Sequence, residues 1–277
     1  MTGSDAVLGA AAAVAIAFAA YRAGALTRSG ACAAFAVGAL TFASGGVAFA
    51  VVLLAFFMPS IALSRLGRAR KRALLDAAKP GARDAMQVLA NGGVATLCAV
   101  LWALTREAHW AWAFGGAYAA ATADTWATEL GTLARQQPRS ILTLRPVAPG
   151  LSGGITAAGT LAEIAGAAWL AVVALPCIGA AIFFQVARSA APSVMTAGLL
   201  ELAVLPLAGV AGATVDSLLG AALQELRHCD ACGRDCESDP HACGAPARLV
   251  RGVRGVTNDV VNLAACATGA VVAYILT

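Results

Sequence analysis

Two carboxylates and two hydroxyls close an apolar stretch of this sequence that begins near Trp110. Asp124 and Thr125 are followed by Thr128 and Glu129. Membrane helices seldom carry acids, because a charge at the bilayer centre costs about 2.5–3.5 kcal/mol on insertion scales. Five residues turn a regular helix by about 140°, so we expect either a break in this helix or different partners for its two acids.

Four further apolar segments carry a polar side chain at a similar expected depth. Together with Asp124, these residues are Asn91, Glu163, Asp216 and Asp259. At 1.5 Å per residue they lie on the order of 8–16 Å from the nearest loop. Gly159 and Gly166 share a helix face with Glu163, and small residues let a backbone or a ligand come close. We therefore predict that five helices line one cavity.

The acids in this set are suited to a hard divalent cation. Mg²⁺ prefers oxygen ligands, usually one or two carboxylates together with substrate phosphates and water. We predict that Asp124, Asp216 and Asp259 bind Mg²⁺ and that Glu129 completes the catalytic set. The alternative is that each acid pairs with a basic residue inside the bundle, but no basic residue lies among the four acids at this depth.

Two other segments have the composition of phosphate-binding sites. Arg83, Gln87 and Asn91 recur at i, i+4 and i+8, so one helical stripe leads from a basic loop into the membrane. The Gly-rich run 149–156 is expected to open a helix, whose free N–H groups attract phosphate. The residues expected to bind nucleotide or phosphate are Lys79, Arg83, Gln87, Asn91, Gly150, Ser152, Gly153, Gly154, Glu163, Asn258 and Asn262.

Plainer interpretations of these two segments stay open. The Gly-rich run has the composition of an ordinary loop, and the basic residues from Arg65 to Arg83 also suit a topology signal or a surface for anionic lipid headgroups. The sequence has no G-x-x-x-x-G-K-[ST] motif, which excludes a P-loop enzyme.

Four cysteines and two histidines share one polar loop, at Cys229, Cys232, Cys236, Cys243, His228 and His241. A C-x₂-C pair with a distal Cys/His pair is typical of zinc sites, and disulfides are disfavoured in the cytoplasm. We predict one structural Zn²⁺ bound by Cys229, Cys232 and Cys243, with His241 or Cys236 as fourth ligand. The remaining cysteines, Cys32, Cys98, Cys177 and Cys266, lie singly in apolar runs and are expected to be packing residues.

Composition indicates the fold that must position these residues. The 277 residues are 60% hydrophobic and 12% charged, with a mean hydropathy of +0.76, which is typical of a polytopic membrane protein. We expect one all-α domain over residues 1–277, with about eight transmembrane helices (seven to nine) and a Cys-rich cytoplasmic loop at 227–250. The helices are expected at about 6–26, 29–44, 46–63, 85–104, 110–134, 154–176, 194–223 and 255–276, with 177–187 either lengthening the sixth or forming a separate piece.

Basic residues fall in alternate connections between these helices. Of the 19 basic residues, only Arg106 and Arg188 lie outside the odd-numbered connections. By the positive-inside rule the odd-numbered connections face the cytoplasm and both termini lie outside. We therefore expect a protein of the bacterial-type inner membrane, with an active site open to the cytoplasm.

Four ordered motifs resemble the phytyl-phosphate kinase family of integral membrane proteins, which has plant, cyanobacterial, bacterial and archaeal members and includes an animal transmembrane protein. They are ADTWATELG at 123–131, PGLSGGIT at 149–156, DSLLGAALQ at 216–224 and TNDVVN at 257–262. Asn91-Gly92-Gly93 also matches, as does the Cys-rich loop followed by Leu-Val-Arg-Gly. The resemblance spans nearly the whole chain.

This resemblance implies a Mg²⁺-dependent kinase that transfers a phosphoryl group from CTP or ATP to an isoprenoid monophosphate such as phytyl or geranylgeranyl phosphate. Such chemistry requires positioning and charge neutralisation, and a monophosphate with a second pKa near 6 needs no strong base near pH 7. Its partners are then membrane lipid and nucleotide, not nucleic acid, and the oligomeric state is open. The alternatives are a CDP-lipid-forming cytidylyltransferase and an ion-coupled transporter, whose acids would lie near the midplane.

Overall fold

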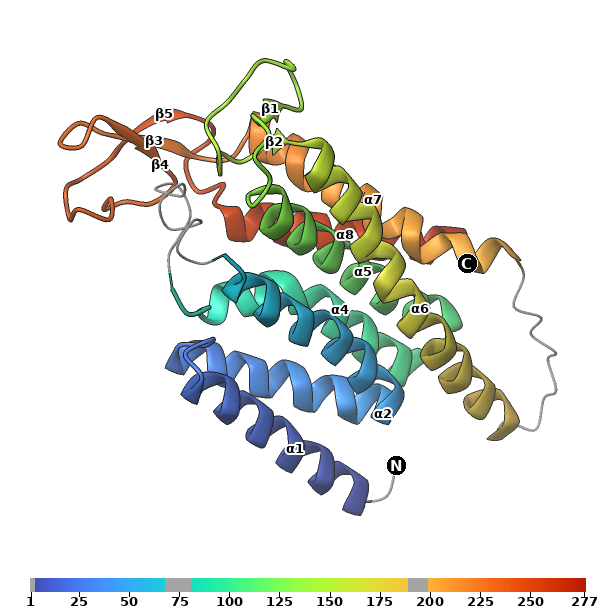
Figure 1. The fold of residues 1–277 in the computed structure, drawn as a ribbon. Coiled ribbons are helices and arrows are strands. Elements are labelled where there is room, and N and C mark those ends of the chain that lie inside the picture. Colours follow the sequence, from blue (N-terminus) through green and yellow to red (C-terminus); the bar gives the residue numbers. More distant parts are fainter. Residues whose placement is uncertain (1–2, 68–80, 189–198) are drawn as a thin grey trace.

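The computed structural model of the chain is a bundle of long helices with short strands at one end (Figure 1). It describes residues 3–67, 81–188 and 199–277. Within these residues the helices are α1 (Gly3–Arg22), α2 (Arg28–Arg65), α4 (Ala85–Thr105), α5 (Ala108–Gly131), α6 (Ala157–Arg188), α7 (Leu199–Ala222) and α8 (Asn258–Leu276). The protein is therefore predominantly helical, as expected.

Two small antiparallel sheets correct the expectation of an all-α fold. β1 (Arg139–Ser140) pairs with β2 (Gly154–Ile155) between α5 and α6. The Cys-rich loop contains β3 (Leu226–Cys229), β4 (Arg234–Cys236) and β5 (Arg248–Arg251), with β3 in the centre. Short strands among turns and polar residues give no clear alternation of apolar residues, so the sequence did not reveal them.

The expectation of eight separate helices is wrong for the residues that the structure describes, which form seven. The segments expected at 29–44 and 46–63 form one element, α2, whose backbone leaves helical geometry at Gly46 (φ 62°, ψ −150°). Nη2 of Arg65, at the end of α2, donates to the carbonyl oxygen of Ala23 at 3.0 Å. A straight helix of 38 residues would be about 57 Å long, so the second half of α2 must fold back along the first.

The connection between α1 and α2 lies beside the start of α4. Leu26 forms a parallel β-bridge with Arg83, and the N–H of Thr27 donates to the Arg83 carbonyl at 3.0 Å. The strands lie at this same end of the bundle, and the start of α1 and the end of α8 lie at the opposite end (Figure 1). The described connections that we expected on one side of the membrane thus gather at one end of the bundle.

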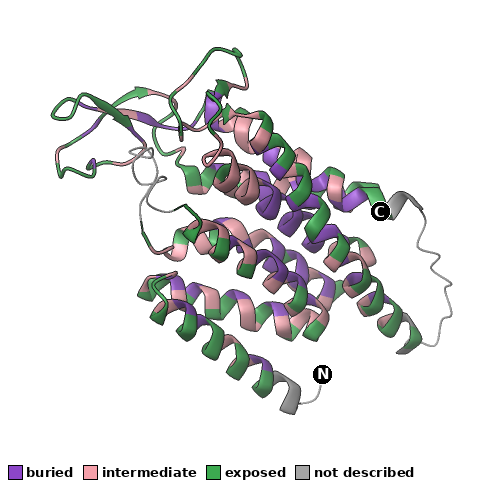
Figure 2. Ribbon diagram, viewed as in Figure 1, coloured by how far each residue is buried: buried purple, intermediate pink, exposed green. Residues whose placement is uncertain are grey.

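α5 forms the centre of the bundle. Every residue from Ala111 to Ala123 is buried, and Figure 2 shows burial concentrated on the inner helices. α5 and α8 cross closely, because a Cβ added to Gly116 would lie 2.3 Å from the carbonyl oxygen of Gly269, and one added to Gly269 would lie 2.4 Å from that of Gly116. Paired glycines allow such close helix contacts in membranes. The acids of α5 are therefore held by a rigid central helix.

Five helices of the described chain are long and apolar enough to cross a bilayer: α2, α4, α8, and the segments Ala157–Gln185 of α6 and Leu202–Ala222 of α7. Large apolar side chains on their outer surfaces are exposed, among them Leu97 on α4, Val172 on α6 and Leu207 on α7. An exposed apolar surface of this kind suits lipid. α5 is not among these five helices; it is instead buried between the other helices of the bundle.

α6 begins later and ends later than its predicted core of 154–176. Gly154 pairs with Ser140 in the β1–β2 ladder, and Thr156 caps the helix by accepting the N–H of Gly159 at 2.9 Å. The Gly-rich run therefore precedes the helix and does not open it. Residues 177–187 lengthen α6, which is one of the two alternatives that we considered.

Candidate active site

Three of the predicted acids converge from three helices at the end of the bundle that carries the strands. Asp124 of α5 lies within hydrogen-bonding reach of Asp216 of α7 and interacts electrostatically with Glu163 of α6. Thr214 donates to Glu163 from its hydroxyl at 3.4 Å. Within the described part of the chain, Asp216 Oδ2 is buried without a hydrogen-bond partner. A buried unpaired carboxylate oxygen fits a bound cation, so this donor set suits Mg²⁺.

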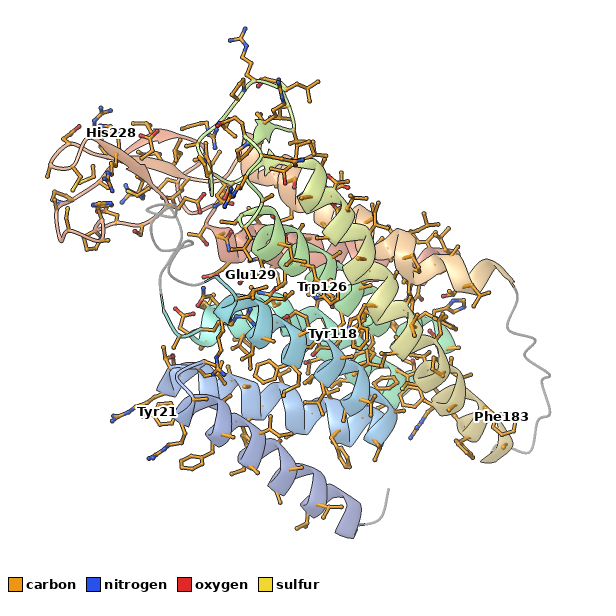
Figure 3. The ribbon with its side chains drawn as sticks, viewed as in Figure 1. Tyr21, Tyr118, Trp126, Glu129, Phe183 and His228 are labelled. Carbon is orange, nitrogen blue, oxygen red and sulfur yellow. The ribbon has the colours of Figure 1, made fainter. Side chains whose placement is uncertain are left out.

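Glu129 faces a different neighbour from Asp124. α5 continues without a break to Gly131, which excludes the broken helix that we considered. Glu129 interacts electrostatically with Asp124 and also with Arg83, on the connection before α4. Figure 3 shows Tyr118, Trp126 and Glu129 in order along α5, towards the strand-bearing end. Glu129 therefore lies between the acid cluster and the basic residue that starts the predicted phosphate-binding stripe.

Arg83 is half-buried, and its backbone is anchored against the connection between α1 and α2. Its N–H donates to the Ala25 carbonyl at 3.0 Å, and a Cβ added to Gly30 would lie 2.1 Å from the Arg83 carbonyl oxygen. Burial lowers the pKa of the Arg83 guanidinium, and the Glu129 carboxylate acts in the opposite direction. An arginine stays charged even so, and a buried guanidinium is an effective phosphate ligand. Lys79, its predicted partner, lies outside the described residues.

The predicted Arg83–Gln87–Asn91 stripe borders an apolar pocket between α1, α2 and α4. Its apolar lining includes Ala13, Val37, Phe42, Leu53 and Phe57, and its polar lining consists of Arg83, Gln87, Asn91 and the phenol of Tyr118. Along the first half of α2 the lining runs from Ala34 to Phe42, about 12 Å at 1.5 Å per residue. Arg83 is the first α4-side residue of this lining, so it lies at one end of the apolar pocket.

Gln87 and Asn91 also have local structural roles. Gln87 and Asp84 form a capping box at the start of α4, with Gln87 Oε1 accepting the Asp84 N–H at 3.1 Å. Asn91 Nδ2 donates to the Gln87 carbonyl at 3.0 Å. The Asp-x-x-Gln pattern that signals this box is visible in the sequence. Phosphate binding by the two amides remains a prediction.

The Gly-rich connection packs against the end of α7. A Cβ added to Gly153, whose φ is +79°, would lie 2.4 Å from the Ala221 Cβ. The Ser152 hydroxyl accepts from Gln224 Nε2 at 2.8 Å and donates to Glu237 Oε1 at 2.5 Å. Glu237 also interacts electrostatically with Asp216. Sequence reasoning missed Glu237, because it lies in the Cys-rich loop and shares no helical face with the other acids.

α8 borders the acid cluster through Cys266. Its thiol donates to the Asn91 carbonyl at 3.7 Å and interacts electrostatically with Asp124 and Asp216. Asn262 and Asp259 share the Cys266 face at i−4 and i−7, closer to the strands. Asn258, at the start of α8, is exposed. The roles of Asp259, Asn262 and Asn258 in metal and phosphate binding remain predictions, as do those of Gly150 and Gly154.

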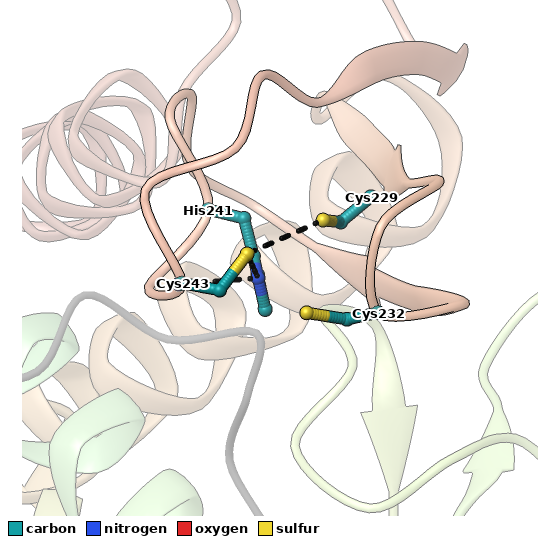
Figure 4. A group of neighbouring side chains, drawn as sticks. All are labelled: Cys229, Cys232, His241 and Cys243. Carbon is teal, nitrogen blue, oxygen red and sulfur yellow. Dashed lines mark hydrogen bonds between the residues drawn. The ribbon is translucent and has the colours of Figure 1, made fainter.

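The Cys-rich loop gathers four of its predicted ligands. The side chains of Cys229, Cys232, His241 and Cys243 converge, with all four ligand atoms within 4.8 Å of one another (Figure 4). Cys236 is not part of this group, because its buried thiol donates to the Ser238 carbonyl at 3.4 Å. Of the two candidates for the fourth ligand, His241 therefore lies with the three cysteines and Cys236 does not.

Long apolar helices around a buried central helix, with apolar side chains outside, define a polytopic integral membrane protein. The chain belongs to the family described as Integral membrane protein DUF92, whose family model matches residues 11–270. This membership agrees with the family resemblance found in the motifs.

Two relatives show how far the similarity extends. The chain is 33% identical over 215 residues to Protein PGR of Arabidopsis thaliana, which covers 72% of this chain and 70% of that protein. It is 38% identical over 114 residues to an uncharacterized membrane protein of Methanocaldococcus jannaschii, which covers 40% of this chain and 45% of the relative. No solved structure matches.

Proposed function

We propose that this protein is a membrane-embedded kinase that transfers a phosphoryl group from CTP or ATP to an isoprenoid monophosphate, giving the diphosphate. One observation supports this proposal: Arg83 lines one end of the apolar pocket and also interacts electrostatically with Glu129 of the carboxylate set. A lipid phosphate has the matching chemistry, because its chain suits the pocket and its headgroup suits a guanidinium. The pocket would hold the prenyl chain, with the acceptor phosphate directed towards Glu129 and Asp124.

The carboxylates fit the metal that such a reaction needs. Bound Mg²⁺ neutralises charge on the phosphoryl group in transit. Asp124 and Asp216 would bind it, with Asp216 Oδ2 as the oxygen that has no partner among the described residues. Asp259 is the proposed third ligand. Glu163 and Glu129 would orient the site.

The remaining polar groups would position the two phosphates. Arg83 would bind the acceptor phosphate, and Glu129 would fix the direction of its guanidinium. Ser152 and the backbone of the Gly-rich connection would bind nucleotide phosphates, because they lie beside Glu237 and the end of α7. The surrounding apolar helices would exclude water, which favours transfer to the lipid phosphate over hydrolysis. The acceptor is already an oxyanion near pH 7, so no base is required.

The same proposal assigns an orientation. The strand-bearing end of the bundle would face the cytoplasm of a bacterial-type inner membrane, because nucleoside triphosphates are available there and all but two of the 19 basic residues lie in connections expected at this end.

The test is incubation of the purified protein with Mg²⁺, CTP or ATP, and a panel of prenyl monophosphates, with products identified by mass spectrometry. We expect a prenyl diphosphate and a nucleoside diphosphate. Pyrophosphate and a CDP-lipid would instead establish the cytidylyltransferase. If no acceptor gives a product, and vesicles that contain the protein take up a solute only with a sodium or proton gradient, the protein is a transporter.

A further inference from the structure

The Cys-rich loop contains a second group of ligating side chains, away from the carboxylate cluster. Cys229 Sγ and Cys243 Sγ are 3.6 Å apart. Two sulfurs on one tetrahedral zinc ion are about 3.8 Å apart, which follows from a Zn–S length of about 2.3 Å. His241 Nδ1 lies 3.1 Å from Cys243 Sγ, and within the described chain the Nε2 of the same ring is buried without a hydrogen-bond partner. The spacing and the donor types both match zinc.

Two tight backbone turns present these four side chains. The N–H groups of Cys232 and Gly233 donate to the Cys229 carbonyl at 3.2 and 2.8 Å, and the N–H of Gly244 donates to the His241 carbonyl at 2.8 Å. Gly233 (φ +65°) and Gly244 (φ +87°) adopt the left-handed conformation that glycine allows. Each turn therefore holds its two ligands in place through the backbone, before any metal is bound.

The same geometry argues against other uses of these cysteines. A disulfide requires an S–S distance of about 2.05 Å, and Cys229, Cys232 and Cys243 are free thiols. Four protein ligands fill a tetrahedral zinc ion and leave no position for water, which is the pattern of a structural site. The loop therefore has the chemistry of a closed zinc site.

Glu237 lies between the two turns and extends from the loop to the bundle. Its Oε1 accepts both the N–H and the hydroxyl of Ser152, at 3.3 and 2.5 Å. Its carboxylate interacts electrostatically with Asp216 and with Arg251 of β5. Only a few residues separate Glu237 from Cys232 on one side and from His241 on the other. A single ion that binds both turns would thus fix both ends of the segment that carries Glu237.

We propose that Cys229, Cys232, His241 and Cys243 bind one structural zinc ion, and that this ion holds Glu237 in its hydrogen bonds to Ser152, beside the carboxylate site. Glu237 is then a positioning residue for the carboxylate site, supplied by the loop and not by the helices. Zinc binding stands apart from the proposed kinase function, whereas the effect of Glu237 on the carboxylate site rests on Mg²⁺ binding by that site.

Elemental analysis of the purified full-length protein tests the zinc site. We expect about one zinc per chain in the wild type and in Cys236→Ser and Cys32→Ser, and a loss of zinc in Cys232→Ser, whose exposed side chain has little packing to disturb. Zinc-free wild-type protein, a disulfide within the loop, or full zinc in Cys232→Ser would overturn the assignment.

Manganese titration followed by electron paramagnetic resonance tests Glu237, with Mg²⁺ as competitor. We expect Glu237→Gln to keep its zinc and to weaken Mn²⁺ binding by about tenfold, in line with the loss of residues that support metal ligands. Asp235→Asn is the matched control, because it removes the same charge from an exposed position on β4. Equal Mn²⁺ affinity in the two variants would refute the role of Glu237 without affecting the zinc assignment. If Glu237→Gln weakens Mn²⁺ binding but the wild type has no kinase activity, the kinase proposal fails and the positioning role of Glu237 is retained.

Discussion

Asp124 of α5 and Asp216 of α7 lie within hydrogen-bonding reach of each other. Two adjacent carboxylates repel when both are charged, so they share either a proton or a cation. If the cation is Mg²⁺, Asp124→Asn and Asp216→Asn should each lower kcat by at least about 100-fold, because a catalytic metal supplies several kcal/mol of charge stabilisation. Turnover at saturating Mg²⁺ measures the effect.

The matched control for these variants is Glu107→Gln, which neutralises an exposed acid at the other end of α5. It should keep wild-type turnover, and all three variants should elute as the wild type does in size-exclusion chromatography. Wild-type rates in the two Asp variants would exclude a shared metal. The same measurement on Asp259→Asn decides whether α8 contributes a third ligand.

Arg83→Ala should raise KM for the prenyl phosphate by at least about tenfold, because it removes a charge-assisted hydrogen bond at the end of the apolar pocket. Arg83→Lys should restore part of this loss, since lysine keeps the charge and lacks the planar fork. Arg65→Ala is the control: Arg65 lies at the same end of the bundle and its guanidinium donates to the Ala23 carbonyl. Equal losses for Arg65 and Arg83 would point to a diffuse basic surface.

Ala13→Trp should shorten the prenyl chain that the protein accepts, because Ala13 lines the pocket between α1, α2 and α4. We expect kcat/KM for geranylgeranyl phosphate to fall about tenfold more than that for geranyl phosphate, a difference within the range for lost apolar contacts in a binding pocket. Ala15→Trp places the same side chain on the exposed side of α1. An equal fall for both acceptors would show that the chain binds elsewhere.

The sequence revealed the helices and the acids because both obey helical periodicity. Asp216 and Glu163 could be assigned to one depth from their distance to the flanking loops, and the structure brings both to Asp124. The close pairing of Asp124 with Asp216 depends on glycines at the crossings of α7, where a Cβ on Gly212 would lie 2.3 Å from the Ala120 Cβ. Those glycines are visible in the sequence, but the residues on the neighbouring helices that they contact are not.

Features that depend on distant segments could not be predicted. Glu237 reaches Ser152 across the whole of α6 and α7, and no local pattern signals such a contact. The apolar pocket likewise exists only because α1 packs beside the folded-back α2. Tertiary packing, not local propensity, decides both the Glu237–Ser152 contact and the pocket.

Gly116→Ala should destabilise the bundle, since its Cβ would lie 2.3 Å from the Gly269 carbonyl oxygen. Overpacking of this kind typically costs about 1–3 kcal/mol. Gly179→Ala on α6 is the matched control, because its Cβ would have nothing within 4 Å. The control should keep or raise the melting temperature in detergent, whereas Gly116→Ala should lower it. Identical melting of the two variants would contradict the close crossing of α5 and α8.

The orientation in the membrane can be tested by cysteine labelling at the two ends of α5. Gln137 and Glu107 are both exposed, Gln137 beyond the strand-bearing end and Glu107 at the opposite end. An impermeant maleimide should modify Glu107→Cys in intact cells and Gln137→Cys only after permeabilisation, relative to the unsubstituted chain with its own thiols. Modification of Gln137→Cys in intact cells would place the carboxylate site outside, away from the nucleotide. The kinase proposal would then fail, because no cytoplasmic triphosphate could reach Asp124 and Asp216.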